Sequence, residues 1–151
     1  MKNTISFRQA VADDAEELLK LQYLCYQPEA ALYGHDIQPL TQRLHEVIAE
    51  IEQGMAFVAV QAGLIVGGVR CRIEGKELLL GKLICHPRVQ RQGIGSRLME
   101  LAEQSARQRG LAAAVLFTGF QSEGNLRLYK RHGYQPTHTK PPFTWLRKNL
   151  G

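Results

Sequence analysis

Hydrophobic and polar positions along the chain follow two different periods, which predict strands and helices in a mixed order. The strand-like runs are short, rich in apolar or β-branched residues and bounded by turn residues. They cover residues 4–9, 55–61, 64–74, 77–87, 111–119 and 143–149, and a further strand starts within 134–139. The run 77–87 is almost continuously apolar, which favours burial on both faces.

Helical spacing of apolar residues predicts four helices. The first begins near Asp13, which has Glu16 three residues further on, the spacing of a capping box. The others cover residues 41–53, the stretch from a glycine-rich segment to about Gln108, and residues 122–133. Two prolines interrupt residues 26–39, which we expect to form a loop or a broken helix.

This order of elements predicts one α+β domain over residues 1–151, built around a mostly antiparallel sheet. One strand–helix–strand crossover runs from residue 77 to residue 118. Such a crossover joins parallel strands, so we expect one parallel pair in the sheet.

Composition indicates which ligands, which cellular location and which cysteine and metal chemistry to expect. Lysine and arginine together number 19 against 14 acidic residues, and the excess lies mainly in the second half, which suits an anionic ligand. No apolar run reaches the length of about 20 residues that spans a membrane, and the start of the chain has no apolar signal core, so we expect a cytoplasmic protein. Cys25, Cys71 and Cys85 lack paired spacing and are expected to be reduced thiols. The histidines show no metal-ligand spacing, so no metal is expected.

A glycine pair stands where a helix begins. In the stretch Gln90-Arg91-Gln92-Gly93-Ile94-Gly95-Ser96, the amides lie at or near a helix start, and two residues carry no side chain. A helix start has unpaired N–H groups and partial positive charge, so this segment predicts an anion cradle. It is not a P-loop, because Gly95 is followed by Ser96-Arg97 rather than by Lys and Ser or Thr. It is not a dinucleotide fingerprint either, because Leu98 stands where a small residue is needed.

The motif, with the apolar strand before it, strongly resembles the acetyl-CoA-binding motif of the GCN5-related N-acetyltransferase (GNAT) family, Gln/Arg-x-x-Gly-x-Gly/Ala. A second signature of that family is matched downstream by Asn125, Leu128-Tyr129 and Gly133-Tyr134. The two signatures stand in the right order and spacing, and the resemblance covers nearly the whole chain.

The resemblance implies the GNAT fold: a mixed, mostly antiparallel, twisted sheet of about seven strands, flanked by about four helices. The strands 77–87 and 111–118 are expected to splay apart around the pantetheine arm of acetyl-CoA. The implied cofactor-binding residues fall into three groups. Pantetheine is expected to pair with the backbone of Leu83, Ile84 and Cys85. The pyrophosphate is expected on the amides of Gln90, Arg91, Gln92, Gly93, Ile94, Gly95 and Ser96, and positive charge is added by Arg91, Arg97 and Lys130 or Arg131. The second signature contributes Asn125, Leu128 and Tyr129.

The implied reaction is the transfer of an acetyl group from acetyl-CoA to a primary amine, by direct attack in a ternary complex. Tyr129 is the expected general acid, and the backbone N–H of Cys85 is expected to stabilise the oxyanion. The glutamate that many relatives carry within the strand before the motif is missing, which leaves Glu77 as a candidate base beside Glu74, His86, Tyr33 and a chain of water molecules. An acetyl-cysteine intermediate on Cys85 is disfavoured, because its neighbour His86 points to the opposite face of the strand.

Residues 26–39 correspond to one wall of the family's acceptor pocket, so Glu29 and Tyr33 are candidate substrate-binding residues. The acceptor is a small-molecule or peptide amine, and a homodimer is possible. One alternative is a catalytically inactive, regulatory acetyl-CoA-binding protein, which the missing strand glutamate supports. Nucleic acid is not an expected partner, because aromatic residues do not interleave with the basic ones, and neither is a membrane.

Overall fold

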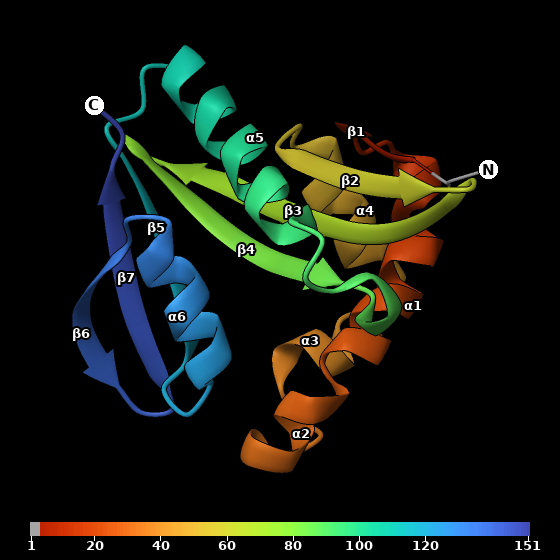
Figure 1. Ribbon diagram of the computed structural model, residues 1–151, viewed down its shortest axis with the longest axis horizontal. Helices are drawn as coiled ribbons and strands as arrows, with labels where there is room; N and C mark the ends of the chain where they lie inside the picture. The colour runs from red at the N-terminus through yellow and green to blue at the C-terminus, as the bar shows by residue number, and fades with distance from the viewer. Residues whose placement is uncertain (1–3) are drawn as a thin grey trace.

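Seven strands form one sheet in the computed structural model, which describes residues 4–151 (Figure 1). The strands are β1 Ile5–Gln9, β2 Ala56–Gln61, β3 Leu64–Glu74, β4 Glu77–Cys85, β5 Ala113–Gly119, β6 Gln135–Lys140 and β7 Phe143–Asn149. Their order across the sheet is β1-β2-β3-β4-β5-β7-β6. Within residues 4–151 every neighbouring pair is antiparallel except β4–β5, which confirms the α+β fold and the single parallel crossover.

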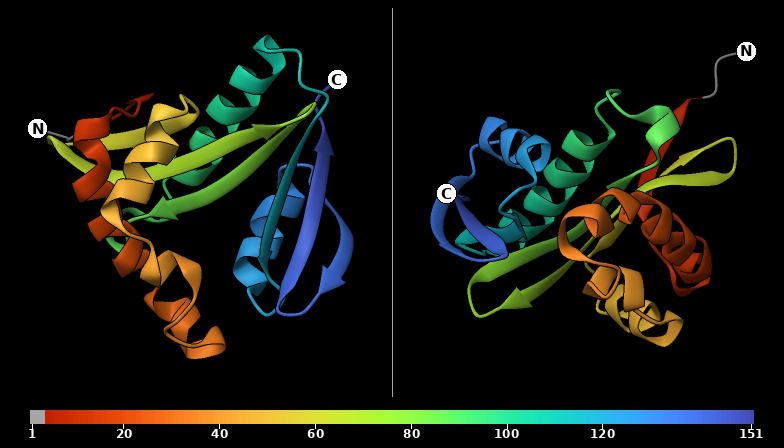
Figure 2. Two further views of the ribbon diagram at one scale, coloured as in Figure 1. Left: turned by 180° about the vertical axis from the view of Figure 1, so that it is seen from behind. Right: turned by 90° about the horizontal axis from the view of Figure 1, so that it is seen from below.

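The helices lie on both faces of the sheet. They are α1 Ala15–Cys25, α2 Gln27–Tyr33, α3 Gln38–Thr41, α4 Leu44–Glu52, α5 Ile94–Gln108 and α6 Glu123–Arg131, with short 3-10 turns at Ala12–Asp14 and Pro87–Val89. Seen from behind, α1 to α4 lie on one side of the sheet, and α5 and α6 lie on the other side (Figure 2). Each side has its own apolar core: Leu98, Leu116 and Leu146 lie in one, and Leu18, Val47 and Val58 lie in the other.

Three expectations about the helices need correction. Residues 4–151 form six α-helices rather than about four, because the segment expected to be a loop or a broken helix contains α2 and the start of α3, each with a proline in its first turn. The helix expected over 41–53 begins at Leu44. Asp13 does not cap α1; its neighbour Asp14 occupies that position and accepts hydrogen bonds from the Val11 amide (2.8 Å) and the Arg8 guanidinium.

The parallel strands β4 and β5 pair only near their amino ends. Their register covers three residue pairs, beginning with Glu77 opposite Ala113 and ending with Leu79 opposite Val115. Further along β4, the register with β3 shifts by one residue next to Lys82, whose φ of 48° marks a bulge. Beyond Leu79, β4 and β5 diverge, as Figure 1 shows, and leave a V-shaped opening between the halves of the sheet.

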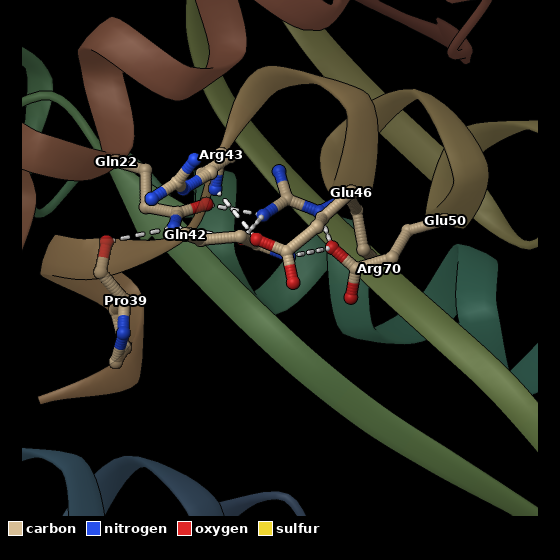
Figure 3. Close-up of polar contacts among 7 residues, drawn as sticks. All are labelled: Gln22, Pro39, Gln42, Arg43, Glu46, Glu50 and Arg70. Atoms are coloured by element: carbon tan, nitrogen blue, oxygen red, sulfur yellow. Dashed lines mark hydrogen bonds and ion pairs between the residues drawn. The ribbon is translucent and has the colours of Figure 1, made fainter.

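A buried polar network fastens α1, α3 and α4 to β3 (Figure 3). Its centre is Arg70, a residue of β3 that is only 3% exposed. The Arg70 Nε lies 3.1 Å from Glu50 Oε1, and its Nη2 donates to the side-chain oxygens of Gln22 and Gln42. Gln22 in turn donates to the carbonyl of Pro39 (2.8 Å). Burial lowers the pKa of Arg70, and the charge of Glu50 opposes that shift.

Candidate active site

A cleft of about 1820 Å³ passes through the opening between β4 and β5. Most residues that the sequence predicts for the site lie along its walls. They are Glu29, Tyr33, Leu83, Ile84, Cys85, Gln90, Arg91, Gly93, Ile94, Gly95, Ser96, Asn125, Leu128, Tyr129 and Arg131. Segments more than a hundred residues apart in the chain are thus brought to one cavity.

Gln92, Arg97 and Glu77 are not among the residues that line this cleft. The guanidinium of Arg97 lies 3.5 Å from Glu100, on the exposed side of α5. Glu77 forms an ion pair with Arg147 at the closed end of the V, where β4 and β5 still pair. The structure therefore does not bring Glu77 to the centre that Tyr129 occupies.

The glycine motif forms an open helix start. Gly93 is the N-cap residue of α5, with a φ of 78°, and no side chain caps the helix. The first amides of α5 therefore have no side-chain partner at the N-terminus, and they carry the partial positive charge of the helix. A Cβ on Gly93 would meet no atom within 4 Å, so the space beside this residue is open, whereas a Cβ on Gly95 would be in ordinary contact with Leu128 and Leu83. This geometry fits a bound pyrophosphate.

Ser96 is engaged by a partner that the sequence did not reveal. Its Oγ lies 2.7 Å from His132 Nε2, at the end of α6. The contact joins the start of α5 to the end of α6, which are the two elements that carry the GNAT-like signatures. Arg131 precedes His132 and lines the cleft, so α6 presents a cation beside the anion cradle.

The edge of β4 that faces the opening carries the backbone N–H of Cys85. The His86 amide donates to the Val66 carbonyl of the neighbouring chain segment (2.8 Å). Because successive amides of a strand point to opposite edges, the N–H of Cys85 points away from β3 and towards the opening. The carbonyl of Cys85 accepts a hydrogen bond from the Cys25 thiol (3.3 Å).

Tyr129 projects from α6 into the interior of the cleft and is 8% exposed. Its ring packs edge-on against Tyr134, with 6.2 Å between the centroids. Burial, and secondarily the charge of Glu29, raises the pKa of Tyr129 to about 12. The phenol therefore stays protonated at neutral pH, which suits a proton donor.

Asn125 lies one turn before Tyr129 on the same helix. Its amide nitrogen donates to the hydroxyl of Thr118 on β5 (3.3 Å), so the side chain is held over the opening. This places a polar side chain on the α6 wall, opposite the free edge of β4.

Glu29 and Tyr33, the candidate residues of the acceptor pocket, form hydrogen bonds between α2 and the segment that connects β5 to α6. Ser122 Oγ donates to the carboxylate of Glu29 (2.8 Å), and the Gln121 amide donates to the hydroxyl of Tyr33 (3.0 Å). Tyr33 Oη also lies 3.3 Å from Ser122 Oγ. This set of contacts, which we call the α2 clasp, bridges the cleft at its open end.

The remaining candidate bases occupy different places. Glu74 and Tyr33 line the cleft, whereas His86 does not. The His86 Nδ1 accepts a hydrogen bond from the Arg88 amide (3.0 Å) and so caps the short turn that follows β4.

The cysteine thiols are held in their protonated form. Burial raises the pKa of Cys25 to about 11 and that of Cys71 to about 12, and it also raises the pKa of Cys85. A protonated thiol is a weak nucleophile, so these environments do not favour covalent chemistry on sulfur. Among residues 4–151, no group of three or more His, Cys, Asp or Glu side chains is arranged to hold a metal ion.

Sequence reasoning missed several residues that shape the cleft, among them Arg70, Lys82 and Ser122. The sequence could have indicated the role of Arg70, because a charged residue within an apolar strand implies a buried polar partner. Ser122 gave no comparable signal, because its role depends on contacts with α2, about ninety residues earlier in the chain.

Comparison with known proteins agrees with this geometry. The family model described as the acetyltransferase (GNAT) family matches residues 15–134, which include both signatures and both strands of the splayed pair. The chain belongs to the GNAT acetyltransferase family. The chain is 26% identical over 139 residues to an uncharacterized N-acetyltransferase of Methanocaldococcus jannaschii, a match that covers 87% of this chain. The chain spans about 61% of the length of that curated relative.

Solved structures share the GNAT fold with this chain. The PaiA N-acetyltransferase of Thermoplasma acidophilum, in complex with coenzyme A, superposes with a TM-score of 0.83 at 16% identity, covering 97% of this chain and 99% of that one. A GNAT-family acetyltransferase of Staphylococcus aureus superposes with a TM-score of 0.81, also at 16% identity, covering 98% and 100%. Likeness at this level of identity establishes the fold. No helix within residues 4–151 has the length and apolarity required to cross a membrane.

Proposed function

We propose that this GNAT protein transfers an acetyl group from acetyl-CoA to a primary amine by direct attack in a ternary complex. The observation that carries the proposal is the splayed cleft, in which the N–H of Cys85 faces the opening from β4 and Tyr129 enters it from α6. The helix start at Gly93 lies on the same cleft, as the place for the pyrophosphate of the donor.

The donor fits the residues that are present. The uncapped amides at the start of α5 match the pyrophosphate, and Arg91 and Arg131 supply positive charge along the same wall. The free edge of β4 offers backbone donors and acceptors to the amides of the pantetheine arm, in the manner of an added strand.

The chemistry assigns two steps to this chain. When the amine nitrogen attacks the thioester carbon, the carbonyl oxygen gains negative charge, which the N–H of Cys85 stabilises by a hydrogen bond. When the carbon–sulfur bond breaks, the phenol of Tyr129 donates its proton to the leaving sulfur. The amine gives up one proton in forming the amide, and water carries that proton to the Tyr129 phenolate, which restores the phenol. Glu29, whose carboxylate lines the cleft, holds the amine beside Tyr129 before that step.

Glu77 has no place in this scheme, because its carboxylate is paired with Arg147 outside the cleft lining. That same observation favours a second candidate function, an acetyl-CoA-binding protein without catalytic activity. In that case the cleft binds the donor but lacks a group to receive the proton of the amine.

A paired experiment separates the two functions. Calorimetry measures acetyl-CoA binding, and a thiol-detection assay measures CoA release with a panel of amines and peptides. We expect binding together with amine-dependent release of CoA. Binding without release across the panel supports the second function, and absence of binding refutes both.

A further inference from the structure

An aromatic surface occupies the part of the sheet that the helices leave uncovered. On the side of α1 to α4, the helices within residues 4–151 leave most of β5 and β7 uncovered (Figure 2). Phe117 of β5 is in register with Trp145 of β7, and Phe143 is two residues earlier on the same face. The ring centroid of Phe117 lies 4.9 Å from that of Phe143 and 5.6 Å from that of Trp145. We call these three residues the aromatic surface.

The aromatic surface is open to solvent in the free protein. Phe117 is 56% exposed and Phe143 is 37% exposed. Clustered aromatic side chains left exposed in this way mark a surface that binds a ligand or a partner, because burying them is favourable.

The aromatic surface is continuous with the candidate active site. Its three residues line the same cleft as Cys85 and Tyr129. Gly119 follows Phe117 by two residues and so faces the same side of β5, where the ring of Tyr33 packs against it. An aromatic path therefore leads from Trp145 to the α2 clasp.

The charges beside the aromatic surface favour an apolar ligand group over a cationic one. Glu77 and Arg147 lie on the same face of the sheet and form an ion pair with each other. The rings are therefore next to a neutralised pair. A cation bound on aromatic faces gains most where a free carboxylate assists it, whereas an apolar group needs only the rings.

We propose that the acceptor is a small amine with an aromatic or bulky aliphatic body, which packs on the aromatic surface while its amino group lies near Cys85 and Tyr129. This inference rests on the proposed function and names its substrate class. The α2 clasp bridges the open end of the cleft through Glu29, Tyr33 and Ser122, which favours a small amine over a polypeptide chain laid across it.

Trp145 reports on the occupancy of the surface directly, because it is the only tryptophan of the chain. Phenylethylamine, hexylamine, ethylamine, putrescine and a short peptide with an N-terminal phenylalanine are titrated into CoA-loaded protein while Trp145 emission is recorded. We expect saturable changes with phenylethylamine and hexylamine at concentrations about tenfold below those needed for ethylamine or putrescine. Equal responses to ethylamine, a preference for putrescine, tighter binding of the peptide, or no saturable response overturns the proposal.

Variants of Phe117 test whether the aromatic surface causes the preference for phenylethylamine. Phe117→Ala is expected to weaken phenylethylamine binding by about tenfold, and Phe117→Leu is expected to keep most of it. Ile73→Ala, which shortens an exposed apolar side chain outside the cleft lining, serves as the matched control. Unchanged binding in Phe117→Ala overturns the proposal, and because Phe117 is exposed, the folded state of that variant is readily verified by circular dichroism.

The same amines distinguish failure of this inference from failure of the proposed function. If Trp145 responds selectively to phenylethylamine but no acetylated product forms, the aromatic surface binds the amine as inferred, and the proposed function fails. If product forms at the same kcat/KM with ethylamine and phenylethylamine, the proposed function stands and the inference fails.

Discussion

The side chain of Tyr33 fills the space that a Cβ on residue 119 would need. A methyl group added to Gly119 would overlap the Tyr33 hydroxyl and ring. The hydroxyl lies there because it accepts a hydrogen bond from the Gln121 amide (3.0 Å). A glycine on β5 is therefore a condition for the α2 clasp, and the clasp sets the position of Glu29 and Tyr33 relative to the cleft.

Gly119→Ala is expected to displace Tyr33 and raise the KM for the acceptor by about tenfold, with little change in acetyl-CoA affinity. A double-mutant cycle with Tyr33→Ala tests the mechanism, because the effect of Gly119→Ala should largely vanish once Tyr33 is shortened. The measurements are steady-state kinetics and calorimetry. If the two substitutions change KM additively, the overlap with Tyr33 is not the cause of the raised KM in Gly119→Ala.

Tyr129→Phe removes the proposed proton donor while keeping the ring that packs against Tyr134. Turnover should fall by about 10²- to 10⁴-fold, with acetyl-CoA affinity unchanged. Tyr23→Phe is the matched control, since the Tyr23 hydroxyl donates to the Gln42 carbonyl (2.6 Å) and the residue does not line the cleft. Equal turnover in Tyr129→Phe and the wild type would remove this residue from the mechanism.

The pH profile of turnover follows from the pKa of Tyr129, which burial raises to about 12. The donor is protonated below that pKa and is lost only as the pH rises through it. We therefore expect no decline in kcat attributable to Tyr129 between about pH 8 and pH 10, whereas an unperturbed tyrosine titrates near pH 10. A decline in kcat centred near pH 10 that is absent from Tyr129→Phe would contradict the raised pKa of Tyr129.

Cys85→Ala is expected to keep activity within about threefold, because the proposed oxyanion donor is the backbone N–H and not the thiol. Burial raises the pKa of the thiol, so iodoacetamide should modify it slowly at pH 7.5. Kinetic assays and mass spectrometry measure both properties. Loss of activity in Cys85→Ala, together with an acetylated wild-type enzyme, would support a covalent route instead.

Arg70→Ala breaks the buried network and leaves Glu50, Gln22 and Gln42 without their shared donor. The free energy of unfolding should fall by about 3 kcal/mol, the usual effect of removing one partner of a buried ion pair. Arg72→Ala on the same strand is the control, since that side chain is 65% exposed and its pair with Glu74 is a surface one. Chemical denaturation measures both variants, and equal losses would show that the network does not stabilise the fold.

The parts of the site that the sequence predicted are those carried by short segments. Gly93 and Gly95 mark a helix start by their spacing, and Asn125 and Tyr129 lie one turn apart on one helix. The strand 77–87 was expected to be buried on both faces, but β4 is half-exposed at Leu79 and Leu83, because these residues line the cleft. The apolar sequence of this strand indicated an apolar environment, but it did not show that part of the strand lines a cleft instead of packing in the core.

The parts that the sequence did not predict depend on contacts between distant segments. The α2 clasp joins residues about ninety positions apart, and the ion pair between Glu77 of β4 and Arg147 of β7 spans β5, which lies between these strands. Neither contact leaves a local pattern. The partners of Arg70 were unpredictable for the same reason, although its position in an apolar strand indicated that partners had to exist.

The stoichiometry of a single reaction with acetyl-CoA and phenylethylamine tests direct transfer in a ternary complex. Mass spectrometry measures the N-acetylated amine and the protein, and a thiol assay measures the free CoA. We expect one acetylated amine for each CoA released, an enzyme that carries no acetyl group, and no CoA release without the amine. CoA release without acetylated amine, or an acetylated enzyme that forms in its absence, would contradict direct transfer.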